Sequence, residues 1–218
     1  MRRDRVVRPL LEILAMAALI TSYIWGWGGA FRGHYHLCLV LYFLIGIAGH
    51  VRRGEGTVDI GLRLDNVRQA AITSLRAVTP WLLVFLGLGI PLGTVDFPPL
   101  PLWPATILNG SLWGTLQQYG LLCVFYRRFC EILPGDRSPM LATGAVFAFF
   151  HLPNPFLSLV TLGAGALSSW LYRRAPNLIV IGVTHAIVTF VIVNSLPSTV
   201  TFGMRVGPNF FRFIPGLE

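Results

Sequence analysis

Lysine is absent from this sequence of 218 residues and acids are few, since all 17 basic residues are arginine against nine Asp and Glu. Charged residues make up 12% of the chain, about half of the roughly 25% typical of a soluble domain. Apolar residues make up 54% and fall in long runs instead of alternating. This composition excludes a disordered chain and predicts that lipid surrounds most of the protein.

Cysteine is also scarce, which disfavours a disulfide framework or a zinc cage. Cys38, Cys123 and Cys130 form no CxxC pair and lie in apolar segments, where thiols are usually inert. The arginines lie mostly at the ends of apolar runs, which is typical of membrane topology signals and not of a surface that binds nucleic-acid phosphates. We therefore expect a membrane protein with no metal, no cofactor and no nucleic-acid partner.

Apolar runs bounded by Arg, Gly and Pro predict an all-α polytopic membrane bundle of about seven transmembrane helices in a single domain, 1–218. The predicted spans are 9–27, 36–50, 68–92, 104–130, 139–152, 156–172 and 177–196. At about 1.5 Å per residue, the second and fifth reach only about 20 Å. Each must include flanking residues or end at a membrane-embedded site. We expect 54–66 to be an interfacial loop and the Pro-rich segment 91–104 to be irregular.

The arginines also orient the bundle, because cytoplasmic loops collect them. If the spans alternate from a cytoplasmic N-terminus, thirteen arginines fall inside, only Arg32, Arg205 and Arg212 fall outside, and Arg76 lies within the third span. We therefore expect an inner-membrane protein with a cytoplasmic N-terminus. The basic residues before the first apolar run resemble the start of a signal peptide, but no clear cleavage site follows and many spans come after it.

Polar side chains inside the apolar runs mark a candidate site, since such groups are costly in hydrocarbon and usually face the bundle interior or a function. They are Gln117 and Gln118 in the fourth predicted span, His151 at the end of the fifth and His185 in the seventh. Each also has a structural interpretation, as interhelical amide hydrogen bonds for the glutamines and as a carbonyl cap for His151. Counted from the cytoplasmic ends, Gln117 and the two histidines lie about 12 to 18 Å deep, so they can share one layer.

Three neighbours complete the candidate site as expected substrate-binding residues. Phe147 lies one helical turn before His151 and could wall a pocket or simply pack. Thr189 follows His185 by one turn, and Asn194 lies about 2.5 turns beyond His185, near the same face.

Together these residues resemble the motifs of the CPBP family, also called Abi, which includes CAAX prenyl proteases and bacteriocin-processing enzymes. The family pattern is a Glu-Glu-x-x-x-Arg helix, a Phe-x-x-x-His helix and a later His-x-x-x-Asn or Asp helix. Phe147 and His151 match the second motif and His185 matches the third, within a core at 104–196. The resemblance implies an intramembrane endopeptidase in the lipid bilayer, acting on hydrophobic or lipidated peptides, whose histidines bind the oxyanion or the substrate carbonyl.

The first motif departs from the family pattern. Gln117 and Gln118 stand where the glutamate pair is expected, Leu122 replaces the arginine and Thr189 replaces the final Asn or Asp. In the family the glutamates are thought to activate water, and an amide cannot accept that proton near neutral pH. Losing a general base typically lowers the rate by about 10²–10⁴-fold. Two histidines with amides also make a weak zinc site.

Two functions therefore stay open. The first is an endopeptidase in which Gln117, Gln118, His151 and His185 form the catalytic set and the glutamines position water. The second is an inactive member that binds a lipid, isoprenoid or peptide, or that partners a membrane complex. A transporter lacks support, because the sequence shows neither an inverted repeat nor a midplane carboxylate.

Overall fold

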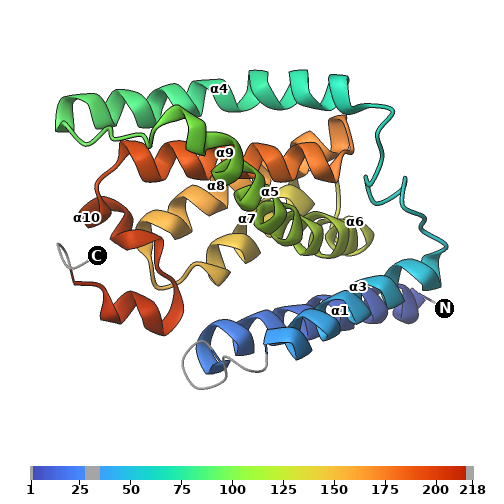
Figure 1. Cartoon of the computed structure of the whole chain (residues 1–218). Helices are drawn as coiled ribbons and strands as arrows, with labels where there is room; N and C mark the ends of the chain where they lie inside the picture. The colour runs from blue at the N-terminus through green and yellow to red at the C-terminus, as the bar shows by residue number, and fades with distance from the viewer. Residues whose placement is uncertain (1, 28–34, 215–218) are drawn as a thin grey trace. The chain divides into compact units, whose positions relative to one another are not determined.

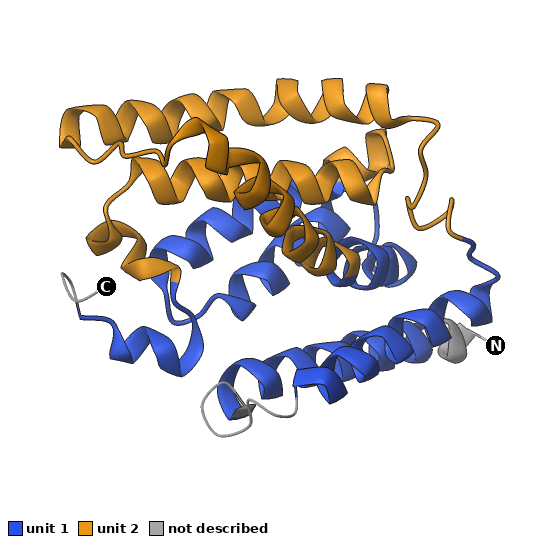
Figure 2. Cartoon of the chain, viewed as in Figure 1, with its two compact units in different colours: residues 1–56, 120–169, 205–214 blue, residues 57–119, 170–204, 215–218 orange. Residues whose placement is uncertain are grey.

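The computed structural model describes residues 2–27 and 35–214, and within them it contains helices and connecting segments but no strand (Figure 1). The chain divides into two compact units (Figure 2). Unit 1 comprises 1–56, 120–169 and 205–214, and unit 2 comprises 57–119, 170–204 and 215–218. Each unit is therefore built from segments far apart in the sequence. The prediction of one domain over 1–218 stays a prediction.

Five helical segments are long and apolar enough to cross a membrane, which confirms the polytopic helical fold of an integral membrane protein. They are Val6–Gly26, Tyr35–Arg53 (α3), Val67–Leu92 (α4), Pro155–Arg174 (α8) and Leu178–Ser195 (α9). The first joins most of α1 (Arg2–Ser22) to the π-helix η1 (Tyr23–Trp27). The predicted second span does include flanking residues, since α3 has 19 residues and is about 29 Å long.

The two other predicted spans are not regular membrane-length helices. In place of 104–130 the chain forms α5 (Trp103–Gln118), the π-helix η4 (Tyr119–Tyr126) and α6 (Arg127–Ile132). The predicted fifth span is α7 (Arg137–Phe150), whose 14 residues reach about 21 Å, less than the roughly 30 Å of a hydrocarbon core. Seven regular spans are therefore not confirmed. The change to π geometry begins directly after Gln118, and such π segments are frequent at functional sites.

In unit 2, α4 and α5 both pack on α9, and the two expected loops hold the ends of α9. Asn177, fully buried, accepts a hydrogen bond from the Val180 backbone N–H at 3.0 Å and donates to the Arg63 carbonyl at 2.8 Å. At the other end the Asp96 N–H donates to the Asn194 carbonyl at 2.9 Å. The irregular conformation predicted for 54–66 is confirmed, whereas in 91–104 it holds for 93–99 alone, because α4 continues to Leu92, a 3₁₀ turn forms at Leu100–Leu102 and α5 begins at Trp103.

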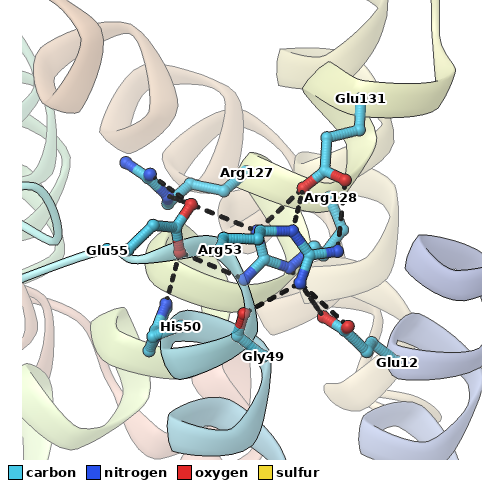
Figure 3. A network of polar contacts seen from close by, with 8 residues as sticks. All are labelled: Glu12, Gly49, His50, Arg53, Glu55, Arg127, Arg128 and Glu131. Atoms are coloured by element: carbon cyan, nitrogen blue, oxygen red, sulfur yellow. Dashed lines mark hydrogen bonds and ion pairs between the residues drawn. The ribbon is translucent and has the colours of Figure 1, made fainter. Parts of the chain in front are cut away.

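Unit 1 contains a partly buried ion-pair network that joins α1, α3, the short loop after α3, and α6 (Figure 3). The network consists of three arginines and three glutamates, with His50 at its edge: Arg53, Arg127, Arg128, Glu12, Glu55 and Glu131. Three of the arginines expected to act as topology signals therefore also neutralise carboxylates, of which Glu12 and Glu55 are half-buried and Glu131 is exposed. This role was not predicted from the sequence, because its partners lie up to 116 residues apart.

Arg128 is the centre of this network. Its side chain is 1% exposed and contacts all three glutamates, Glu12 and Glu131 at 2.8 Å and Glu55 at 3.3 Å. Gly49 allows the close packing, because a Cβ there would lie 2.7 Å from a Glu12 carboxylate oxygen. Burial by itself would raise the pKa of Glu55, but hydrogen bonds from His50, Arg127 and Arg128 outweigh burial and lower this pKa to about 2. Glu55 is therefore ionised near neutral pH.

Candidate functional site

Small residues bring α5 and α9 into close contact. Gly110 and Gly114, four residues apart on α5, face Ala186 and Gly182 on α9. A Cβ at Gly114 would lie 2.6 Å from the Gly182 carbonyl oxygen, and a Cβ at Gly182 would lie 2.0 Å from the Thr115 hydroxyl. Spacing of this kind is how membrane helices approach closely without a hydrophobic driving force. It also brings His185 on α9 close to α5, since a Cβ at Gly114 would lie 3.1 Å from His185 Cδ2, and Gln118 follows Gly114 by one turn.

Gln118 and His185 meet beside this crossing. Gln118 is 1% exposed, and its Nε2 donates a hydrogen bond to His185 Nδ1 at 3.3 Å. An amide N–H can only donate, so His185 accepts at Nδ1 and carries its hydrogen on Nε2. His185 is then a neutral imidazole whose second nitrogen can donate to a carbonyl oxygen. The pair cannot act as a general base through Gln118.

The two glutamines carry buried acceptors without a hydrogen-bond partner among the described residues, Oε1 of Gln117 and Oε1 of Gln118. A buried polar atom left unpaired costs about 1–3 kcal/mol. Natural proteins usually satisfy such atoms with water or a ligand. A water molecule or a peptide N–H is the donor that these oxygens require.

His151 lies in unit 1, at the end of α7. Its Nδ1 donates to the Phe147 carbonyl at 2.7 Å, and the two rings meet edge to face with centroids 4.8 Å apart. The predicted carbonyl cap is therefore present. Because Nδ1 keeps its hydrogen, the Nε2 of neutral His151 has a lone pair that can accept a proton. His151 and His185 thus offer opposite nitrogens, one an acceptor and the other a donor.

The segment after His151 is held by Asn154, a residue that the sequence analysis did not single out. Asn154 is fully buried, accepts a hydrogen bond from the Leu157 N–H at 3.0 Å and donates to the Arg205 carbonyl at 3.0 Å. The signal was available, since Asn followed by Pro is a common helix start. Asn154 therefore positions the start of α8 and the turn that follows His151.

Asn194 and Thr189 lie on α9 beyond His185. Asn194 donates its side-chain N–H to the Phe190 carbonyl at 2.7 Å, within its own helix. Thr189 is half-buried one turn after His185. Their assignment to substrate binding stays a prediction.

The predicted convergence of His151 with Gln118 and His185 also stays a prediction, because His151 belongs to unit 1 and the other two residues belong to unit 2. Within the described part of the chain, no group of three His, Cys, Asp or Glu side chains could hold a metal ion.

Replacing Gly182 by alanine is expected to destabilise the protein by about 1–3 kcal/mol, as overpacking of a close contact usually does. The new methyl group would collide with the Thr115 backbone and hydroxyl, so α5 and α9 must separate. Thermal unfolding in detergent measures the effect. Gly163→Ala is the matched control, because no atom lies within 4 Å of a Cβ at that helical position. Equal melting temperatures for the two variants would contradict the close crossing.

Comparison with protein families places most of the chain in a known family. The family model for type II CAAX prenyl endopeptidase Rce1-like proteins matches residues 67–191, more than half of the chain. The matched region includes α5, α7, His151 and most of α9, so all the candidate residues except Asn194 lie within it. No curated protein and no solved structure is significantly similar to the chain.

Proposed function

Because the chain belongs to the Rce1-like family of type II CAAX prenyl endopeptidases, we propose that it takes up hydrophobic or prenylated peptides in the membrane and hydrolyses them very slowly. The observation that carries the proposal is the hydrogen bond between Gln118 and His185. It supports a site that recognises a peptide group, and the amide at position 118 supplies no proton acceptor for water activation.

Peptide recognition follows from the donors and acceptors of unit 2. His185 Nε2–H suits a substrate carbonyl oxygen, and the unpaired Oε1 atoms of Gln117 and Gln118 suit a peptide N–H or an ordered water. A peptide bond offers one acceptor and one donor, so it complements this set. The residues involved need no metal and no cofactor for this binding.

A second candidate function is hydrolysis with a histidine as the base. The observation that favours it is the bond from His151 Nδ1 to the Phe147 carbonyl, which leaves Nε2 able to accept a proton. A neutral imidazole can accept a proton at such a nitrogen. In this mechanism Gln117 and Gln118 would position the attacking water while His151 takes its proton. The site would then be an active endopeptidase without the glutamate pair.

A reconstituted assay with a fluorescent farnesylated peptide tests the proposal by measuring binding and cleavage together. Wild-type protein is expected to bind the peptide with little or no cleavage. His185→Ala should weaken binding about 10-fold, the loss of roughly one hydrogen bond or 1.4 kcal/mol. His36→Ala, which changes an exposed histidine near the start of α3, is the control.

Three outcomes separate the two functions. Binding without cleavage that weakens only in His185→Ala supports slow or absent hydrolysis. Rapid wild-type cleavage that His151→Ala abolishes would establish the histidine mechanism instead. Failure of the wild-type protein to bind the peptide would contradict both functions.

We further propose that the protein resides in the inner membrane with its N-terminus in the cytoplasm. The support is the distribution of arginines along the sequence: if the seven predicted spans alternate, thirteen arginines lie on the cytoplasmic side and three on the other.

A further inference from the structure

We propose that a basic groove in unit 2 binds the phosphate group of an anionic membrane lipid. The groove lies between the first turns of α4 and the connection from α8 to α9, and it encloses about 770 Å³. Four arginines line it: Arg63, Arg68, Arg76 and Arg174. The peptide-binding function proposed above does not use any of these side chains.

The groove carries an excess of positive charge that the described residues do not neutralise. Its one acidic residue, Asp65, pairs with Arg63. Arg68 and Arg76 are exposed and form no ion pair with any described residue. Arg174 lies over the Trp170 ring, 5.2 Å from its centroid, which orients the guanidinium but leaves its charge. Arginines grouped in this way are suited to phosphate, whose oxygens they bind through paired N–H groups.

The position of the groove along α4 matches the lipid headgroup layer. The helix has 26 residues, so it is about 39 Å long and exceeds the roughly 30 Å of a hydrocarbon core. About 30 Å counted back from its end at Leu92 reaches Thr73, which lines the groove. Arg76, one turn deeper, can extend its long side chain back to the phosphates. A soluble anion would not require this depth.

An exposed apolar stripe continues from the groove along α4. Ile72 lines the groove and is 39% exposed, and Leu83 and Ile90 are 63% and 68% exposed. Leu83 and Ile90 follow Ile72 by eleven and eighteen positions, which are about three and five full turns. The three residues therefore share one helix face. An acyl chain can follow this stripe while its phosphate occupies the groove. The combination favours a phospholipid over free phosphate, and resembles the basic pockets in which membrane proteins hold lipid headgroups.

Native mass spectrometry of the full chain in detergent tests the proposal by counting retained lipids. Phosphatidylglycerol is the anionic probe, phosphatidylcholine the zwitterionic probe and inorganic phosphate the soluble competitor. We expect phosphatidylglycerol to bind at least 10-fold more tightly than phosphatidylcholine. The double variant Arg76→Gln/Arg174→Gln should lose about 10-fold in phosphatidylglycerol affinity. The control Arg52→Gln/Arg137→Gln removes two exposed arginines from unit 1 and should bind as the wild type does.

The outcomes distinguish the lipid from other ligands and from the peptide site. Equal losses in both double variants, or equal binding of the two lipids, would overturn the proposal. Displacement by equimolar inorganic phosphate would assign the groove to a free anion and overturn the lipid assignment.

The double variant Arg76→Lys/Arg174→Lys keeps the positive charge and should retain most of the phosphatidylglycerol affinity. Loss of affinity there together with a lowered melting temperature would show that the arginines serve folding, which also overturns the proposal. Binding of the farnesylated peptide is read separately and does not depend on the result.

Discussion

Replacing Gln118 by glutamate is expected to raise the rate of prenyl-peptide hydrolysis by about 10²-fold over the wild-type chain, because it supplies the missing general base. The new carboxylate would lie where the Gln118 amide now meets His185, at 3.3 Å. A histidine at this distance favours the ionised carboxylate and can donate to it from Nδ1, after its hydrogen moves there. Cleavage of a farnesylated reporter peptide in proteoliposomes measures the gain.

The gain is expected to stop short of full activity. Leu122, where the family pattern has arginine, is fully buried and offers no charge to hold a carboxylate ionised. Adding Gln117→Glu should therefore bring little further gain, because two adjacent buried carboxylates repel and one stays protonated.

The control for this gain is Asn109→Asp, which adds an acid to the exposed side of the same helix and should leave cleavage unchanged. A Gln118→Glu protein that binds the peptide and still shows no cleavage would contradict the assignment of position 118 to the catalytic base. It would leave the inactive binding function in place. A gain that survives His185→Ala would show that the carboxylate works without its histidine neighbour.

Replacing Arg128 by methionine is expected to destabilise the protein by about 3–5 kcal/mol, the usual effect of removing one partner from a buried ion-pair network. Methionine fills much of the same space, so the loss comes mainly from charge. Three glutamates would face two arginines, and Glu12 and Glu55 are only 11% and 12% exposed. The midpoint of thermal unfolding in detergent measures the change.

Two arginines provide a graded comparison for this prediction. Arg127 pairs with Glu55 and is 26% exposed, so Arg127→Met should destabilise the protein by no more than about 1 kcal/mol. Arg137 is exposed at the start of α7, and Arg137→Met should have almost no effect. Equal stability of all three variants would show that the network does not hold α1, α3 and α6 together.

The membrane character of the chain and most of its helices could be predicted from the sequence, because burial in lipid requires long apolar runs and satisfied backbone groups. The same reasoning identified Gln118 and His185, since a polar residue in such a run is unusual. The sequence analysis was wrong where the length and composition of an apolar run do not determine the type of helix. At 104–130 the apolar run continues through Tyr119–Tyr126, but the helix changes to π geometry there.

Only the tertiary structure could decide which polar groups meet. The hydrogen bond from Gln118 to His185 depends on Gly114 and Gly182 lying in contact, and two glycines 68 positions apart carry no mark of that contact in the sequence. The contact between Arg128 and Glu12 is even less visible in the sequence, because each residue by itself is typical of a topology signal or of the membrane interface. Apolar patterning acts over neighbouring residues, so the sequence alone determined the membrane helices. Ion pairs and helix crossings join residues far apart in the chain, so folding alone decided the network, the amide–histidine pair and the basic groove.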